Sequence, residues 1–366
     1  MCCIVYSGDE MPYYTPLRYP GGKRRLVPTV TRLLEENNLK DVHYAEPYAG
    51  GAAIALALLL EEYASVIHIN DLSRPVFAFW HSVLNNTADL CSRIEKTKVT
   101  MREWQRQRAV YENRDSAPLA ELGFATLFLN RTNRSGIIAG GVIGGKEQTG
   151  EWGVDARFGK PELIQRIRKI GRFGSRIRLY QMDALDFTKS VVANLGKSGF
   201  AFYDPPYIEN GNDLYLNDYT IEGHRDLSKE VAKLDVPWVV TYDYSAVRHG
   251  LYPRCRRVAY GLNYAANGRH EGKEVMFVSR SLSLPKDWQR SEPFLMSALA
   301  VRSSKKAVVY GMMERMRPRP EMIEGPQAGE RFIGALKTVL KVPKSAVPVP
   351  FKKPALKGKR PATRKG

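Results

Sequence analysis

The sequence predicts an α/β fold, in which strands and helices alternate along the chain. A short strand is expected at 43–45, and it runs into the glycine-containing loop 46–51. A helix rich in alanine and leucine follows over 52–63, and the next strand, 65–70, ends at Asp71. A strand, a glycine turn, a helix and a second strand that ends in a carboxylate make up half of a nucleotide-binding α/β unit.

This alternation is interrupted by a long segment of different character. Residues 75–175 are polar and helical at first, over 93–111, and then rich in glycine and irregular, over 131–159. We interpret them as a mostly helical insertion. The alternation returns after this segment, where a helix is expected at 227–234 and strands are expected at 178–181, 199–203, 238–242 and 275–279.

The length and composition suit one large α/β domain with an insertion and an appendage. Of the 366 residues, 43% are hydrophobic, which is ample for a packed core. The large domain is expected to comprise residues 11–74 and 176–284, on either side of the insertion. Residues 285–366 form a C-terminal extension rich in proline and basic residues, and its end, from about 352, is expected to be disordered.

Most of the net positive charge lies in this extension. The formal net charge of the chain is +18. Residues 301–366 contain 17 Lys and Arg against 4 Asp and Glu, a net charge of +13. Such a tail predicts an attraction to a polyanion that does not depend on base sequence. The rest of the chain is only mildly basic, so charge alone does not identify its activity.

Several classes of protein are not favoured by the sequence. No apolar run reaches the roughly 18 residues that a membrane-spanning helix needs, and the first residues do not resemble a signal peptide. The cysteines form no CxxC pair and show no metal-site spacing. We therefore expect reduced thiols, no metal, no membrane partner and a cytoplasmic location for a chain whose cysteines are Cys2, Cys3, Cys91 and Cys255.

The strongest chemical signal is the run Asp204-Pro205-Pro206-Tyr207, directly after the apolar strand 199–203. The amino group of an aromatic base is a poor nucleophile because its lone pair is delocalised into the ring. The Asp204 carboxylate and the Pro205 carbonyl can both accept hydrogen bonds from such an amine and draw the lone pair out. Two prolines stiffen the loop, and the Tyr207 ring offers a face on which a base can stack.

Two further motifs point to an adenosine-type cofactor. The turn 46–52 contains two glycines that allow a ligand to approach the backbone, and Asp71 could accept hydrogen bonds from both ribose hydroxyls. The run 18–23 precedes the first expected helix. Within it, Lys23 could neutralise a carboxylate of the cofactor, and Tyr19 could pack against its apolar portion.

In content and order, these motifs resemble those of the Dam-type DNA adenine methyltransferases. The run RYPGGK is followed by EPYAGGAA, INDLS, FLNRT and DPPY, and the resemblance covers roughly residues 16–280. It implies a Rossmann-like fold with a mixed sheet, S-adenosylmethionine (AdoMet) as the methyl donor, and a target-recognition insertion. It also implies direct methyl transfer to an adenine that is flipped out of double-stranded DNA.

The resemblance implies roles for individual residues as well. The residues that match the family's cofactor motifs, and are therefore expected around AdoMet, are Tyr19, Lys23, Glu46, Pro47, Gly50, Asp71, Asp183 and Asp204. Those expected to hold the target base are Asp204, Pro205, Pro206 and Tyr207. A restriction nuclease or another defence protein as partner, and an association with the nucleoid, would fit such an enzyme.

The insertion matches the family only in part. Leu129-Asn130-Arg131 matches the family's LNR run, but the aromatic-Asn-Gly and FNVP-like segments that usually follow are replaced at 132–136 and 152–155. We therefore expect contact with DNA, but the family's recognition sequence does not carry over. The residues expected to contact phosphates or guanine edges are Asn130, Arg131, Arg134, Lys146 and Arg157.

Two alternatives remain open on the sequence alone. Related Pro-Pro-Tyr loops also methylate planar amides, so the substrate could be RNA or a protein glutamine, although the LNR run favours DNA. The chain could also be a DNA-binding homologue that has lost catalysis. The intact DPPY run and Lys23 argue against that loss.

Overall fold

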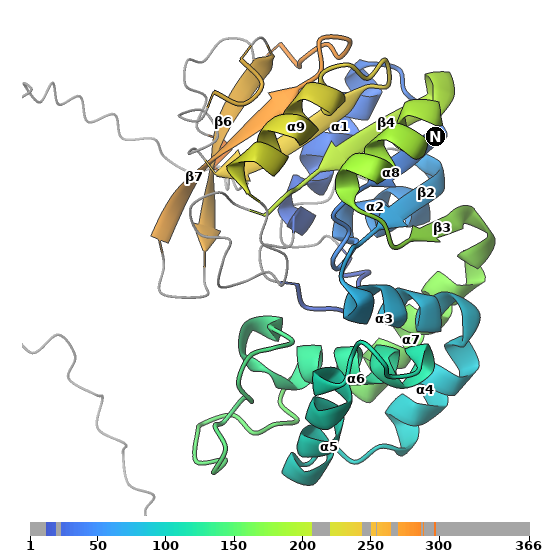
Figure 1. The fold of residues 1–366 in the computed structure, drawn as a ribbon, viewed down its shortest axis with the longest axis vertical. Helices are drawn as coiled ribbons and strands as arrows, with labels where there is room; N and C mark the ends of the chain where they lie inside the picture. Colours follow the sequence, from blue (N-terminus) through green and yellow to red (C-terminus); the bar gives the residue numbers. More distant parts are fainter. Residues whose placement is uncertain are drawn as a thin grey trace, which may run out of the picture. The chain divides into compact units, whose positions relative to one another are not determined.

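A mixed sheet with helices on both faces forms the centre of the computed structural model (Figure 1). The chain divides into two compact units, Met1–Arg302 and Ser303–Gly366. All described residues belong to the first unit; they are 12–19, 23–206, 220–243, 250–253, 255–264, 270–286, 288, 296 and 297. The expectations for Tyr207 and for the basic tail lie outside the described residues.

Eight strands form one sheet in the order β3-β2-β1-β4-β5-β7-β6-β8. Strands β1 to β5 are parallel, β7 is antiparallel to both β5 and β6, and β8 pairs with β6 in parallel. The sheet confirms the predicted α/β fold with a mixed sheet. The strands are Val42–Glu46 (β1), Ala64–Asn70 (β2), Ile177–Tyr180 (β3), Gly199–Tyr203 (β4), Trp238–Asp243 (β5), Arg256–Tyr264 (β6), His270–Val278 (β7) and Met296–Ser297 (β8).

Side chains that alternate along the central strands fill two cores, one on each face of the sheet. Tyr44 of β1 and Phe200 of β4 pack in the first core, whereas their neighbours Ala45 and Ala201 pack in the second. Both β1 and β4 are therefore buried on both faces, as parallel strands usually are. The helices that cover the first core are Val27–Glu36 (α1) and Ala53–Leu60 (α2), and those that cover the second are Ala184–Ser190 (α8) and Ile221–Val231 (α9) (Figure 1).

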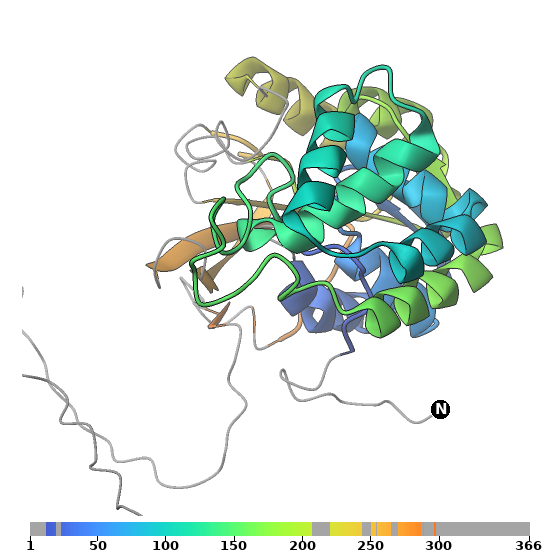
Figure 2. The ribbon, with the colours of Figure 1, turned by 90° about the horizontal axis from the view of Figure 1, so that it is seen from below.

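Five α-helices lie between β2 and β3, within the predicted insertion. Most residues of α6 are buried, and α6 packs against α3 and α5. Figure 2, a view from the side of the insertion, shows these helices in front of the sheet. The domain boundaries at 75 and 175 stay a prediction, because contacts join the insertion and the sheet into one unit. The helices are Arg74–Asn85 (α3), Thr87–Lys96 (α4), Met101–Glu112 (α5), Leu119–Thr132 (α6) and Lys160–Arg172 (α7).

The helical stretch expected at 93–111 is interrupted. Helix α4 ends at Lys96 and α5 begins at Met101, so the stretch expected to be helical consists of parts of two helices with a break between them. The reason is local, because Thr100 is an N-cap whose Oγ1 accepts a hydrogen bond from Glu103 N at 3.2 Å. In the part of the chain that the structure describes, no helix is both long enough and apolar enough to span a membrane.

Candidate active site

Strands β1, β2 and β4 are parallel, so their carboxyl ends lie along one edge of the sheet, where α/β folds bind ligands. Asp204 directly follows β4 at this edge. Its Oδ1 accepts a hydrogen bond from Thr241 Oγ1 at 2.7 Å, and Lys23 Nζ lies 3.4 Å from the same oxygen. The described part of the DPPY run, Asp204 to Pro206, is thus anchored by side chains from two other parts of the chain.

Lys23 links two carboxylates in the interior. It begins the short 3-10 helix Lys23–Leu26, and its Nζ donates to both carboxylate oxygens of Glu274 on β7 at 3.1 Å. Burial raises the pKa of the Asp204 carboxyl to about 6; Lys23 opposes this rise and Glu274 adds to it. Above pH 6, Asp204 is therefore mostly ionised and can act as a hydrogen-bond acceptor.

The glycine turn after β1 contacts the end of β2. Gly50 N donates to Asp71 Oδ2 at 2.9 Å, and Ser73 N donates to the other carboxylate oxygen at 2.9 Å. Gly50 has a φ of +46°, and a Cβ atom there would lie 2.7 Å from the ring of Tyr19. Glycine is therefore required both by the backbone conformation and by the close approach of Tyr19. Burial raises the pKa of Asp71 to about 6, and both N–H groups oppose the rise.

A first cavity opens between this edge of the sheet and the insertion. Its empty volume is about 1070 Å³, a figure that includes the open solvent at its mouth. Asp183 lines it and also caps α8, since its Oδ1 accepts a hydrogen bond from Leu185 N at 2.8 Å. The structure brings together most of the expected cofactor residues here, namely Tyr19, Pro47, Gly50, Asp71, Asp183 and Asp204.

A second cavity adjoins the first and contains the other two expected cofactor residues, Lys23 and Glu46. The Glu46 carboxylate accepts a hydrogen bond from Ala55 N, in the first turn of α2, at 3.3 Å. Burial raises the pKa of Glu46 well above its usual range, and the charge of Asp204 adds to that rise. The residues that line both cavities, and so mark their junction, are Tyr19, Tyr48 and Asp204.

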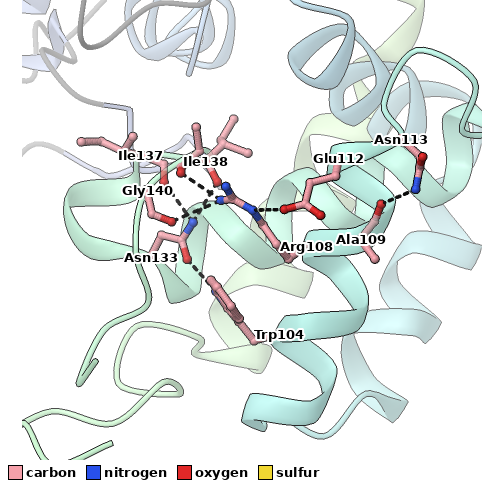
Figure 3. A network of polar contacts seen from close by, with 10 residues as sticks. Trp104, Arg108, Ala109, Glu112, Asn113, Asn133, Ile137, Ile138 and Gly140 are labelled. Atoms are coloured by element: carbon pink, nitrogen blue, oxygen red, sulfur yellow. Dashed lines mark hydrogen bonds and ion pairs between the residues drawn. The ribbon is translucent and has the colours of Figure 1, made fainter. Parts of the chain in front are cut away.

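The insertion supplies one wall of the first cavity, residues 137–139. Figure 3 shows the network that holds this loop. Asn133 Nδ2 donates to the carbonyls of Ile137 and Ile138 at 3.0 and 2.8 Å. Trp104 Nε1 in turn donates to Asn133 Oδ1 at 2.7 Å. Arg108 donates to the carbonyl of Ala139 at 2.9 Å. It is paired with Glu112 at 3.1 Å. Helix α5 therefore positions part of the cavity.

Asn130 does not have the role that its motif suggested. Its side chain is buried, Oδ1 accepts a hydrogen bond from Arg18 N at 2.7 Å, and Nδ2 donates to the carbonyls of Arg18 and Gly136 at 2.9 and 2.7 Å. An amide that is buried and committed to three backbone groups cannot reach DNA. Asn130 instead ties α6 to the segment that carries Tyr19, and the expected DNA contact is corrected accordingly.

The other residues expected to contact DNA lie closer to the surface. Arg134, Lys146 and Arg157 are exposed, whereas Arg131 is only partly exposed and its Nε donates to the Arg157 carbonyl at 2.7 Å. The loop that carries Lys146 is ordered by Gln148, whose Nε2 donates to two loop carbonyls at 2.8 and 2.7 Å. A DNA contact by these four basic residues stays a prediction.

The fold and the site together define a class of protein: an α/β enzyme with a cavity beside a carboxylate-Pro-Pro loop that suits methylation of an amino group. The chain matches the family model of the D12 class N6 adenine-specific DNA methyltransferase over residues 19–253. It belongs to that family, which confirms the resemblance to the Dam-type enzymes. The protein is therefore an adenine-specific DNA methyltransferase, with DNA as its substrate and a requirement for a methyl donor.

Solved structures with a similar course of the chain include other methyltransferases. A candidate RNA methyltransferase of Pyrococcus horikoshii has a TM-score of 0.34 and 9% sequence identity, over 75% of this chain and 90% of that chain. The rRNA methyltransferase AviRa of Streptomyces viridochromogenes has a TM-score of 0.32 and 12% identity, over 77% of this chain and 91% of that chain. A candidate methyltransferase of Escherichia coli has a TM-score of 0.28 and 11% identity, over 70% and 86%.

Proposed function

We propose that the enzyme binds AdoMet across the two cavities and methylates the N6 amino group of an adenine flipped out of duplex DNA at a specific sequence. The observation that carries this proposal is the position of Asp204. This carboxylate lines both cavities at their junction and is fixed by Thr241 and Lys23. If the two halves of AdoMet occupy the two cavities, its methyl group lies between them, so a carboxylate that binds the target amino group should lie where the cavities meet.

The residues present fit the two halves of AdoMet. The first cavity offers carboxylates for ribose hydroxyls and an adenine amino group, from Asp71 and Asp183, between mostly apolar walls. Each Asp71 oxygen accepts one backbone N–H and has a further lone pair available. The second cavity is lined by an ammonium group, that of Lys23, and a carboxyl group, that of Glu46, which could bind the carboxylate and the ammonium of an amino acid moiety. When bound, AdoMet supplies an electrophilic methyl group at the junction.

The chain's own residues prepare the target nitrogen. The Asp204 carboxylate and the Pro205 carbonyl accept hydrogen bonds from the adenine amino group, which concentrates its lone pair on nitrogen. Thr241 and Lys23 keep the carboxylate in place while it does so. The nitrogen loses one proton on methylation, and Asp204, whose pKa is about 6, is placed to accept it.

A base inside a duplex cannot reach a carboxylate at the bottom of a cavity, so the adenine must leave the stack. The insertion presents exposed basic residues, Arg134 and Lys146, on its loops, and the loop of Arg134 continues into the cavity-lining residues 136–139. We infer that these loops read the bases around the target and give the enzyme its sequence specificity. Modification of such sites, alone or beside a restriction nuclease, is the role this reaction would serve.

The test is methyl transfer from labelled AdoMet to unmethylated genomic DNA, with the product nucleosides separated. Wild-type enzyme should label N6-methyladenine, and sequencing of the product should find it in one sequence context. Asp204→Asn should abolish the label yet still bind AdoMet in calorimetry. The matched control is Asp226→Asn, an exposed carboxylate on α9 paired with Lys229, which should behave as wild type. AdoMet binding without any label, or label in RNA or protein only, would contradict the proposal.

A further inference from the structure

Four arginines meet where the N-terminal segment, α6 and α7 come together. Arg18 lies in the N-terminal segment, Arg131 in the last turn of α6, Arg157 in the loop before α7, and Arg166 within α7. The charges of the other three all act on Arg131. We call these four residues the arginine cluster. Tyr13 lies against it, with the guanidinium carbon of Arg166 4.9 Å from the centre of its ring.

The arginine cluster has an ordered geometry. Arg131 donates from Nε to the Arg157 carbonyl at 2.7 Å, which fixes its guanidinium and leaves the two terminal nitrogens for other acceptors. Tyr13 is held by a hydrogen bond from its hydroxyl to the Leu17 carbonyl at 3.2 Å. Two terminal N–H₂ groups side by side form the fork that binds a carboxylate or a phosphate in a bidentate manner.

The cluster is not neutralised by the described part of the protein. No carboxylate among the described residues pairs with any of its four arginines. Other arginines do pair: Arg93 with Asp89 at 2.8 Å and Arg176 with Glu62 at 3.0 Å. Burial, first of all, and the charges of Arg18, Arg166 and Arg157 together lower the pKa of Arg131 to about 10, while Tyr13 opposes the decrease. Like charges are thus held together without a counter-charge, and a bound anion would relieve their repulsion.

The position of the cluster indicates which anion it meets. Its four arginines line neither of the two cavities, whereas Tyr13, which contacts the cluster, lines the second cavity together with Asp204. An anion at the cluster would therefore lie outside the AdoMet site but close to the reaction centre. A guanine edge is matched by one bidentate arginine, whereas a phosphate can accept from several arginines at once.

We propose that the arginine cluster binds a backbone phosphate of the DNA close to the target adenine. This inference rests on the proposed function, because it requires DNA to be seated with an adenine at Asp204. It assigns the cluster to positioning of the strand and not to reading of the sequence. Part of it comes from the N-terminal segment, outside the insertion expected to contact DNA.

The test uses the double variant Arg157→Gln/Arg166→Gln, which leaves the more buried Arg131 in place. Affinity for duplex DNA is measured at several salt concentrations, with the wild type and with Arg178→Gln as control. Arg178 is an exposed arginine on β3. We expect the slope of log K against log salt to fall by about 0.9 for each phosphate that the variant no longer neutralises, and affinity at low salt to fall about tenfold. The decrease should be equal for cognate and unrelated sequences.

A second measurement locates the phosphate. Single phosphates of a cognate duplex are replaced in turn by neutral methylphosphonates. One position should weaken binding by wild-type enzyme and should have no further effect on the double variant. Thermal unfolding of each variant provides the control for folding.

Three outcomes would overturn the inference. An unchanged salt slope means that the cluster does not meet a phosphate. A changed preference among sequences with an unchanged slope assigns the arginines to base edges. Weaker AdoMet binding with an unchanged slope assigns them to the cofactor. Failure of the proposed function is separate, because it would appear as wild-type enzyme that binds AdoMet and does not methylate DNA.

Discussion

Two clusters of charged side chains in this enzyme, one around Lys23 and the other around Arg131, differ in how their charges are balanced. In the first, the ammonium group of Lys23 lies between the carboxylates of Asp204 and Glu274, at 3.4 and 3.1 Å. In the second, the arginine cluster, like charges meet and none is paired with a carboxylate of the described chain. The first is compensated from within and the second is not.

This difference separates two tasks. A catalytic carboxylate must stay in one position and must be ionised when it meets the amino group, and the buried ammonium group of Lys23 favours both. A binding surface for a polyanion must be left without a partner, so that its ligand supplies the missing charge. Loss of the Lys23 ammonium group should therefore destabilise the fold, whereas the uncompensated cluster should cost stability until DNA is bound.

The largest expected effect comes from removal of the central cation in the compensated cluster. Lys23→Met leaves two carboxylates buried without a counter-charge and should lower the free energy of unfolding by about 3–5 kcal/mol. Glu274→Gln is the matched variant, because it leaves one cation with one carboxylate; we expect a decrease of about 1 kcal/mol. Urea unfolding at pH 7.5 measures both. Equal decreases for the two variants would contradict a cluster organised around Lys23.

The pH dependence of this destabilisation has a defined sign. Without Lys23, the pKa of Asp204 should rise above its value of about 6 in the native state. A carboxyl whose pKa is raised in the folded state binds a proton more readily there than in the unfolded chain. The folded variant therefore gains stability as the pH falls through that pKa. The difference between Lys23→Met and wild type should shrink from pH 8 to pH 5.

The next effect concerns the reaction itself. Asp204 must be ionised to accept the amino hydrogen bond, and burial raises its pKa to about 6. In wild-type enzyme, kcat/KM should therefore rise about tenfold per pH unit up to about pH 6 and then level off. Initial rates from pH 5 to pH 8.5 measure this. A flat profile through pH 6 would show that the compensated cluster holds Asp204 ionised throughout.

Parts of the site were accessible from sequence because they depend on local patterns. The turn 46–52 follows β1 and Asp71 follows β2. Neighbouring parallel strands bring their carboxyl ends together, so these two parts lie side by side. Asp204 follows the same rule at the end of β4. The order of strand, turn and helix thus fixes which side chains reach this edge of the sheet.

Other parts depend on contacts that no local pattern encodes. Glu274 lies 251 residues from Lys23 in the chain, on a strand without a motif, and Thr241 is one of several polar residues on an otherwise apolar strand. Asn130 was expected to contact DNA because it lies in the LNR run by which the insertion resembles the family. Its burial depends on how α6 packs against the segment that contains Arg18. Only the packed fold decides whether such a polar group faces solvent or backbone.

A smaller effect distinguishes Arg108, which is paired with a carboxylate, from the unpaired arginines of the arginine cluster. Arg108 is paired with Glu112 and donates to the carbonyl of Ala139, in the wall of the first cavity. Arg108→Gln should weaken AdoMet binding about tenfold and leave the salt slope of DNA binding unchanged. Calorimetry and DNA titrations measure the two quantities, with Arg106→Gln, an exposed position on the same helix, as control. A lower salt slope with unchanged AdoMet binding would place Arg108 with the DNA-binding arginines.

The smallest expected effect is an increase in the free energy of unfolding, opposite in sign to the decreases predicted above. Arg157 is exposed and adds to the repulsion within the arginine cluster, so Arg157→Gln should raise the free energy of unfolding by a few tenths of a kcal/mol at low salt. Salt screens this repulsion, so the gain should vanish near 1 M salt. Arg93→Gln, which breaks the pair with Asp89 on α4, should instead cause a slight decrease. Guanidinium is itself a salt, so the comparison needs urea unfolding at both ionic strengths. If Arg157→Gln were destabilised as Arg93→Gln is, the arginine cluster would contain a counter-charge, and its need for an anion would disappear.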